Sequence, residues 1–182
     1  MDWTAIPKRT FLDTSVVNFM LDYGAEIYDN APVPAWASDR VSQDIESLRG
    51  IVTTGYRASW QFAISPSTYE EVSNTTDPSR RRHLNGWFAE LWQYWSDIAR
   101  QDNNPRRPNG INPKLIELLD ILPDVRDREL ICDAITNRCD SFCTRDWKTI
   151  LKYRPQLQIL PIEIRTPTEW WKLIGPYAAL WK

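Results

Sequence analysis

The chain has 182 residues and a formal net charge of −2, which suits one domain that buries its own core without disulfides. This slightly acidic balance argues against a protein that coats nucleic acid nonspecifically, although local basic clusters could still attract a phosphate backbone. With 13 prolines and 10 tryptophans against 6 glycines, the composition favours rigid aromatic packing and excludes a disordered, linker-rich chain.

The cysteines and the hydropathy pattern bear on the cellular compartment. Cys132, Cys139 and Cys143 leave one thiol unpaired in any disulfide scheme and lack the Cys-x-x-Cys spacing of a zinc site. We therefore expect buried free thiols. No apolar run approaches the ~20 residues of a membrane span, and the N-terminus has no apolar signal-peptide region. These features predict a cytoplasmic protein without a membrane partner.

The first predicted elements are a strand, a turn and a helix. Residues 8–13 (KRTFLD) indicate a short strand with Asp13 at its carboxyl end. Thr14 or Ser15 can cap the helix that follows, and Gly24 supplies a stop shortly after it.

The middle of the chain predicts helices around a second strand. Residues 25–38 are rich in turn formers, and residues 39–52 show the helical spacing of a helix that covers a sheet. Residues 60–64 (WQFAI) indicate a compact apolar strand, and a helix follows at once through residues 68–72. Residues 77–100 predict a long helix with a broad apolar face.

The last part of the chain alternates helices and strands after a proline-rich loop. The loop covers residues 103–113, the helices cover 112–122, 127–137 and 146–153, the strands cover 141–144 and 157–162, and an aromatic-rich helix closes one face at 166–181. Helices that alternate with short apolar strands indicate an α/β domain.

Four acidic residues stand where apolar segments begin or end. Asp13 and Asp146 each lie at the carboxyl end of a strand, the edge that holds the ligand crevice in open α/β sheets. Asp127 falls in the first turn of a helix, near the centre of its apolar stripe, and Glu71 lies in the helix after the second strand. Converging carboxylates repel one another unless a cation lies between them, so the pattern suggests a site for a hard divalent ion.

Three segments resemble the PIN domain, a family of metal-dependent nucleases found in many bacterial RNA-cleaving proteins. FLDTSVVNF (residues 11–19) looks like its first motif, ISPSTYEEV (64–72) like its second, and DRELICDAITNRCDSFCTRDW (127–147) like its third and fourth together. The order and spacing of the motifs also agree. The resemblance implies a three-layer α/β/α sandwich with a central, mostly parallel sheet, in a single domain over residues 1–182.

The chain departs from the compact members of that family in three places. Two helical insertions stand at about residues 25–58 and 76–121, and a C-terminal extension covers residues 163–182. These additions weaken an assignment as a simple toxin.

The resemblance also implies roles for individual residues. Asp13, Glu71, Asp127 and Asp146 fall on the acidic positions of the family, and Thr144 falls on the polar residue that commonly precedes the last acid. The four acids are then expected to bind Mg²⁺ or Mn²⁺ and to be catalytic. We expect Asp13 and Asp127 to be direct ligands. Glu71 and Asp146 would complete the cluster, and one of them would orient the attacking water.

Each acid also has a purely structural interpretation. Asp13 could cap a helix, and Asp146 could begin one. Glu70 competes with Glu71 for the second acidic position, because each has a Ser or Thr at capping-box spacing. The family motif favours Glu71.

The residues expected to bind substrate are Thr14, Thr144, Arg145 and Lys148. Arg145 and Lys148 flank Asp146 and could neutralise phosphates. The helical spacing of Trp87, Trp92 and Trp95 indicates core packing, whereas Trp147, next to Asp146, is a candidate for base stacking.

The function favoured by these observations is that of a ribonuclease acting on single-stranded or structured RNA, with a toxin-like role left open. Two alternatives remain: a nuclease for structured DNA, and a non-catalytic PIN-like module that binds RNA or protein. RNA is the expected partner. An antitoxin protein and a second copy of the chain, forming a homodimer, are further partners that the resemblance suggests.

Overall fold

The protein is built around a parallel β-sheet. The computed structural model describes residues 6–58, 60–74, 76, 89–93, 96 and 113–181. In this part of the chain, four strands pair in the order β2-β1-β3-β4, and every pairing is parallel. The strands are β1 (Arg9–Leu12), β2 (Gln61–Ala63), β3 (Ser141–Cys143) and β4 (Glu163–Arg165). The predicted α/β class is confirmed.

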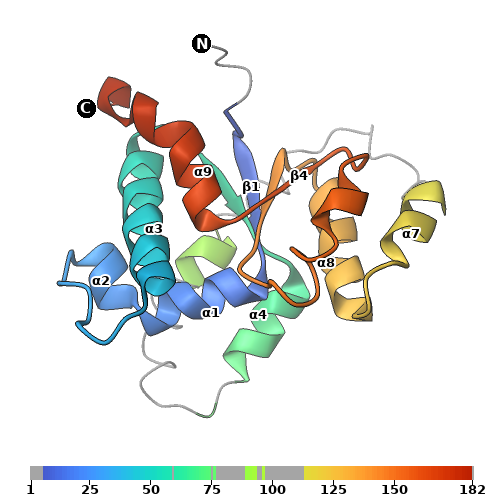
Figure 1. The fold of residues 1–182 in the computed structure, drawn as a ribbon, viewed down its shortest axis with the longest axis horizontal. Coiled ribbons are helices and arrows are strands. Elements are labelled where there is room, and N and C mark those ends of the chain that lie inside the picture. Colours follow the sequence, from blue (N-terminus) through green and yellow to red (C-terminus); the bar gives the residue numbers. More distant parts are fainter. Residues whose placement is uncertain are drawn as a thin grey trace.

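Helices cover both faces of the sheet (Figure 1). Leu12 of β1 belongs to one core cluster and its neighbour Phe11 to the other, so the sheet is buried on both sides, as in a three-layer α/β/α arrangement. The helices are α1 (Thr14–Asp22), α2 (Gly24–Tyr28), α3 (Asp39–Ala58), α4 (Pro66–Ser73), α7 (Pro113–Leu119), α8 (Val125–Thr136) and α9 (Pro167–Ile174), with 3₁₀ helices η3 (Arg154–Leu157) and η4 (Gly175–Trp181).

The face that carries α1, α3 and α9 holds the larger core. Trp170 of α9 is fully buried and lies edge-on to Phe62 of β2, with ring centroids 5.8 Å apart. The helices α3 and α9 lie side by side in Figure 1, and Gly50 of α3 faces Trp171 of α9. A Cβ at Gly50 would stand 2.6 Å from the indole ring of Trp171, so the absence of a side chain lets α9 pack there.

The opposite face carries α7 and α8. Leu130, Ile131 and Ala134 of α8 are buried against Phe142 of β3, which stacks on Phe11 with a centroid distance of 5.6 Å. The apolar stripe predicted for residues 127–137 therefore faces the sheet. This packing fixes the first turn of α8, and with it Asp127, relative to the strands.

Two predicted elements near the C-terminus are wrong. Residues 146–153 form turns and not a helix, because the Asp146 side chain accepts the backbone N–H groups of Lys148 and Thr149 and replaces regular helical bonds. The strand predicted at 157–162 is replaced by η3 and turns, and the strand comes later, at Glu163–Arg165. Pro155 and Pro161 cannot donate the hydrogen bonds that a continuous helix or strand would need.

Other differences are smaller. The helix predicted at 39–52 continues to residue 58, and the turn-rich segment 25–38 begins within the short helix α2, for which Gly24 is the first residue and not a stop. The predicted helix at 77–100 lies outside the described residues except for 89–93 and 96, which are helical, and the loop at 103–112 lies outside them as well. None of the helices described is at once long and apolar enough to cross a bilayer.

All three cysteines are free, as predicted. Cys139 and Cys143 are buried, and Cys132 is half-buried. Burial raises the pKa of the Cys139 thiol to about 12, which keeps it protonated and unreactive at neutral pH.

The close approach of α3 and α9 yields a prediction for stability. Gly50→Ala improves helix propensity by about 1 kcal/mol, but its Cβ overlaps the Trp171 ring, so we expect a net loss of about 1–2 kcal/mol in the free energy of unfolding. Urea unfolding measures it. In the Trp171→Leu background the same change should no longer destabilise, because the ring is gone. Equal losses in both backgrounds would show that the close contact is not the cause.

Candidate functional site

Asp13 and Asp146 lie at the same edge of the sheet. Asp13 directly follows β1, and Asp146 comes three residues after the end of β3, the neighbouring parallel strand. The backbone N–H of Asp13 donates to the carbonyl of Cys143 at 3.0 Å, which continues the β1–β3 pairing to the site. The sequence expectation that each acid lies at the carboxyl end of a strand is therefore confirmed, and the structure shows that the two strands are neighbours.

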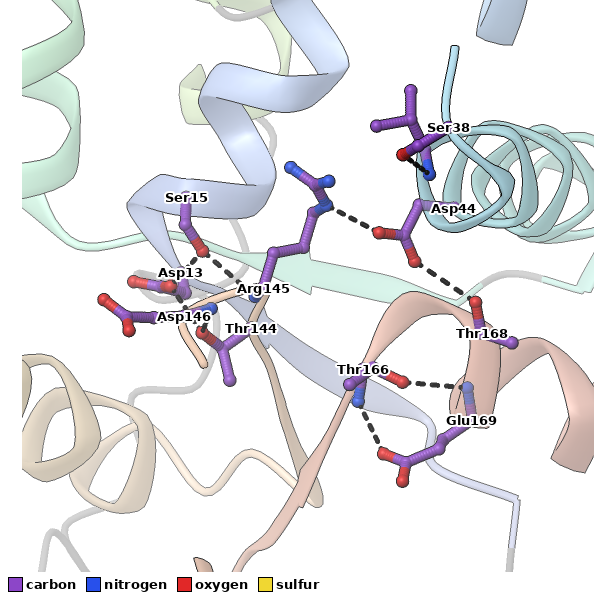
Figure 2. A network of polar contacts seen from close by, with 11 residues as sticks. Asp13, Ser15, Ser38, Asp44, Thr144, Arg145, Asp146, Thr166, Thr168 and Glu169 are labelled. Carbon is purple, nitrogen blue, oxygen red and sulfur yellow. Dashed lines mark hydrogen bonds and ion pairs between the residues drawn. The ribbon is translucent and has the colours of Figure 1, made fainter. Parts of the chain in front are cut away.

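Asp13 is a buried carboxylate held by hydroxyl groups. It is 3 % exposed, and its Oδ2 accepts hydrogen bonds from Ser15 Oγ and from Thr144 Oγ1, the latter at 2.7 Å (Figure 2). Burial raises the pKa of Asp13, the two hydroxyl donors oppose that shift, and the negative charge of Asp146 adds to it. Asp13 occupies the N-cap position of α1, but its side chain makes no capping bond. Its carboxylate therefore faces the site and not the helix end.

Thr144 connects the two strand-end acids. Its Oγ1 donates to Asp13 and accepts the backbone N–H of Asp146 at 2.9 Å, and Thr144 has no exposed surface. A hydroxyl has one proton to donate and lone pairs to accept, so this pair of bonds satisfies it. Thr144 thus fixes the backbone of Asp146 relative to the Asp13 carboxylate.

Asp146 is shaped by the turn that follows it. Its Oδ1 accepts the backbone N–H groups of Lys148 and Thr149, both at 2.8 Å. Partial burial acts to raise the pKa of Asp146, but these hydrogen bonds and the nearby Lys148 charge outweigh it, and the pKa lies below its ordinary value. Asp146 is therefore ionised at neutral pH. Its Oδ1 is occupied within the protein.

Asp127 adds a third carboxylate, from the helix layer that contains α8. It lies in the first turn of α8 and is 9 % exposed, and its Oδ2 is buried without a hydrogen-bond partner. Burial raises the pKa of Asp127 to about 6; a hydrogen bond from the Thr149 side chain opposes this shift, and the charges of Asp13 and Asp146 reinforce it. The charge of Asp146 thus acts on Asp13, and the charges of Asp13 and Asp146 act on Asp127.

The fourth predicted acid, Glu71, has a different environment. It is exposed on α4 and forms an ion pair with Arg126 at 3.0 Å, and Glu70 is exposed as well. Neither glutamate caps α4, because Ser65 accepts the backbone N–H of Thr68 and serves as the N-cap. Arg126 is the residue before Asp127, so Glu71 lies beside the start of α8.

The residues expected to bind substrate divide into two groups. Thr14 and Thr144 are buried and take part in internal hydrogen bonds, Thr14 with Thr68 Oγ1 on α4 at 3.1 Å. Arg145 donates from Nε to Asp44 at 2.8 Å, and its guanidinium lies 3.5 Å from the ring centroid of Phe19. Lys148, in contrast, is exposed beside Asp146. Most of these side chains therefore support the acids from within the protein.

Asp44 is the site-supporting residue that the sequence analysis missed. It is 4 % exposed on α3 and accepts from Arg145 Nε and, at 3.1 Å, from Thr168 Oγ1 on α9 (Figure 2). The helical spacing could have indicated a buried Asp44, because this residue precedes Leu48 by four positions on the apolar face of a helix. An unpaired carboxylate on that face is costly, so a partner was to be expected. The backbone N–H of Arg145 in turn donates to Ser15 Oγ at 3.0 Å, so the chain of contacts reaches Asp13.

The carboxylate oxygens of the three aspartates are chemically suited to a hard cation. Asp13, Asp127 and Asp146 offer carboxylate oxygens, the ligands that Mg²⁺ and Mn²⁺ prefer, and the Asp127 Oδ2 has no partner within the protein. Across the described residues, no three His, Cys, Asp or Glu side chains are already grouped as a metal site.

No family model, curated protein or solved structure matches the chain. The resemblance to the PIN domain therefore rests on the motif residues themselves.

The raised pKa of Asp127 gives a pH-dependent stability. Because the folded-state pKa, about 6, lies above the ordinary 3.8, the folded state holds the extra proton between these values. The corresponding stabilisation is complete below about pH 4 and is lost as the pH rises through about 6. In EDTA, Asp127→Asn should raise the free energy of unfolding by about 1–3 kcal/mol at neutral pH and flatten its pH dependence. If the free energies of unfolding of wild type and Asp127→Asn changed with pH by the same amount, this prediction would be contradicted.

The Asp44–Arg145 pair gives a second prediction. Asp44→Asn removes the charge that faces a largely buried guanidinium, and we expect a loss of about 1–3 kcal/mol in the free energy of unfolding. Asp120→Asn, which breaks the more exposed Arg128–Asp120 pair, is the control and should cost under about 1 kcal/mol. Urea denaturation of both variants measures the difference, and equal losses would show that burial does not strengthen the pair.

Proposed function

We propose that the chain is a divalent-metal-dependent ribonuclease with a PIN-like fold. The observation that carries the proposal is the Asp127 carboxylate, which has a buried oxygen without a hydrogen-bond partner and lies within electrostatic reach of Asp13 and Asp146. A buried carboxylate with one oxygen left without a partner, beside two other acids, destabilises the fold unless something cationic meets it. A functional requirement for these charges explains why they stand together.

The position of the acids supports the same proposal. Asp13 and Asp146 follow adjacent parallel strands, at the sheet edge where α/β enzymes bind their ligands, and α8 presents Asp127 toward them. When bound there, Mg²⁺ or Mn²⁺ would lower the pKa of a water and offset charge on a phosphodiester. Asp13 and Asp127 would hold the ion, because both are buried and both have raised pKa values that a cation would reverse.

The remaining residues of the site take supporting roles in this proposal. Asp146 is ionised and has Oδ2 for a cation or for orienting an attacking water, while its Oδ1 is held by the turn. Thr144 keeps Asp146 in register with Asp13. Glu71 is exposed and paired with Arg126, so we assign it an outer position, with contact to a cation through water.

We infer RNA as the substrate from the resemblance to the PIN domain and from Lys148, an exposed cation beside Asp146 that can meet a phosphate. The free thiols agree with a reducing cytoplasm as the compartment. An antitoxin partner and a homodimer belong to the same proposal. Arg80, Arg81, Arg82, Arg106 and Arg107, further basic residues of the sequence, lie outside the described residues.

A non-catalytic module that binds RNA or protein is the second candidate. It shares the expected PIN-like fold with the main proposal and differs from it in making no cut. A nuclease for structured DNA remains the third alternative, and it differs from the main proposal only in the substrate.

Cleavage of labelled oligonucleotides tests these functions. Purified protein with Mn²⁺ should cut single-stranded RNA, and EDTA should abolish the cut. Asp13→Asn should slow cleavage by on the order of 100-fold or more, because it removes the charge that holds the cation. Asp133→Asn, an acid of α8 outside the proposed site, is the matched control and should cut at the wild-type rate.

The outcomes separate the candidates. Cleavage of structured DNA in place of RNA would favour the third alternative. Binding of RNA without cleavage in Mn²⁺ would favour the non-catalytic module, and equal cleavage by wild type and Asp13→Asn would remove the proposed site from the reaction.

A further inference from the structure

An exposed tryptophan adjoins the acidic site. Trp147 directly follows Asp146 and is 47 % exposed, in the turn whose first residues the Asp146 side chain organises. Exposing a large indole to water is unfavourable, and this ring stays on the surface although the core accepts other indoles. Its position is set by the same turn that positions the acid.

An arginine from a distant part of the chain covers one face of this indole. The guanidinium of Arg40, in the first turn of α3, lies 3.8 Å from the centroid of the Trp147 ring. Stacking of a guanidinium on an indole holds both groups in place and combines a cation with a flat apolar surface. Lys148 adds a second exposed cation next to the ring.

Trp60, Trp92 and Trp170 have packing roles that explain them. Trp60 and Trp170 are buried and lie close together, and Trp92 packs against Tyr69. Trp36 is 75 % exposed, but it comes from the loop before α3, where its ring centroid lies 6.2 Å from that of Tyr23. Trp147 is therefore the exposed indole that adjoins the acids.

We propose that Trp147 and Arg40 form a stacking platform for one nucleobase of single-stranded RNA. The proposal rests on the ribonuclease function above and specifies how its substrate is held. Every base has a flat face, and stacking on an indole with positive charge alongside is the general way in which proteins hold single strands. Lys148, which follows Trp147 in the chain and is exposed, supplies a cation that can meet the phosphate of a base stacked there.

The platform implies a preference for unpaired substrate. A base inside a duplex has both faces covered by its neighbours and cannot stack on the indole without being unstacked first. Single-stranded RNA should therefore bind more tightly than a hairpin of the same length and charge.

The test is binding without cleavage. Fluorescence anisotropy of a labelled oligouridylate, in EDTA, measures affinity for wild type, Trp147→Ala, Trp147→Phe and, as the control, Trp36→Ala. We expect Trp147→Ala to weaken binding about tenfold, Trp147→Phe by less, and Trp36→Ala by under about twofold. An abasic oligomer of the same length and charge should bind weakly to wild type and should not respond to Trp147→Ala. Circular dichroism checks that each variant is folded.

The platform would be overturned by wild type that binds no oligonucleotide, by Trp147→Ala that binds as tightly as wild type, or by equal affinity for the abasic and base-containing oligomers. Equal weakening by Trp36→Ala would also overturn it, because that tryptophan lies outside the proposed platform. Since binding is measured without a divalent ion, the result is independent of the cleavage assay. If the protein binds bases at Trp147 but cuts no nucleic acid, the stacking site stands and the nuclease proposal fails. If the protein cuts RNA but Trp147→Ala binds it as tightly as wild type, the nuclease proposal stands and the stacking site fails.

Discussion

The rest of the site depends on the burial of the Asp13 carboxylate at the end of β1. A buried carboxylate is costly, and the protein offsets that cost with hydrogen bonds from the Ser15 and Thr144 hydroxyls. Thr144 extends the arrangement to Asp146 through the backbone of the neighbouring strand end. The placement of a charge in the core thus determines which polar residues must surround it, and these residues bring the second acid into position.

The segments expected to be additions to a PIN-like domain also support this site. Asp44 comes from α3, in the expected first insertion, and Thr168 comes from α9, in the expected C-terminal extension. Thr168 donates to Asp44, which in turn pairs with Arg145, the residue before Asp146. The first turn of α9 is fixed by a capping box between Thr166 and Glu169. The packing of α3 on α9 and the polar contacts of the acids are therefore one continuous arrangement. We interpret the additions as parts of the site and not as appendages.

Local sequence patterns predict the strands and the helix that carry the acids. They fail where contacts between residues far apart in the chain determine the structure. The apolar runs ahead of Asp13 and Asp146 identify the two strand ends, and helical periodicity places Asp127 toward the sheet. The Asp44–Arg145 pair spans 101 residues, so no local pattern encodes it. The turns at 146–153 could not be predicted either. Hydrophobic periodicity does not reveal that the Asp146 carboxylate accepts the backbone N–H groups of Lys148 and Thr149.

Thermal unfolding at neutral pH, with and without Mn²⁺, tests whether Asp13, Asp127 and Asp146 together hold a divalent cation. A ligand that binds only the folded state raises its melting temperature, so we expect an upward shift for wild type that grows with Mn²⁺ concentration and is lost in Asp127→Asn. A wild-type melting temperature that does not respond to Mn²⁺, or that rises equally in the variant, would contradict it.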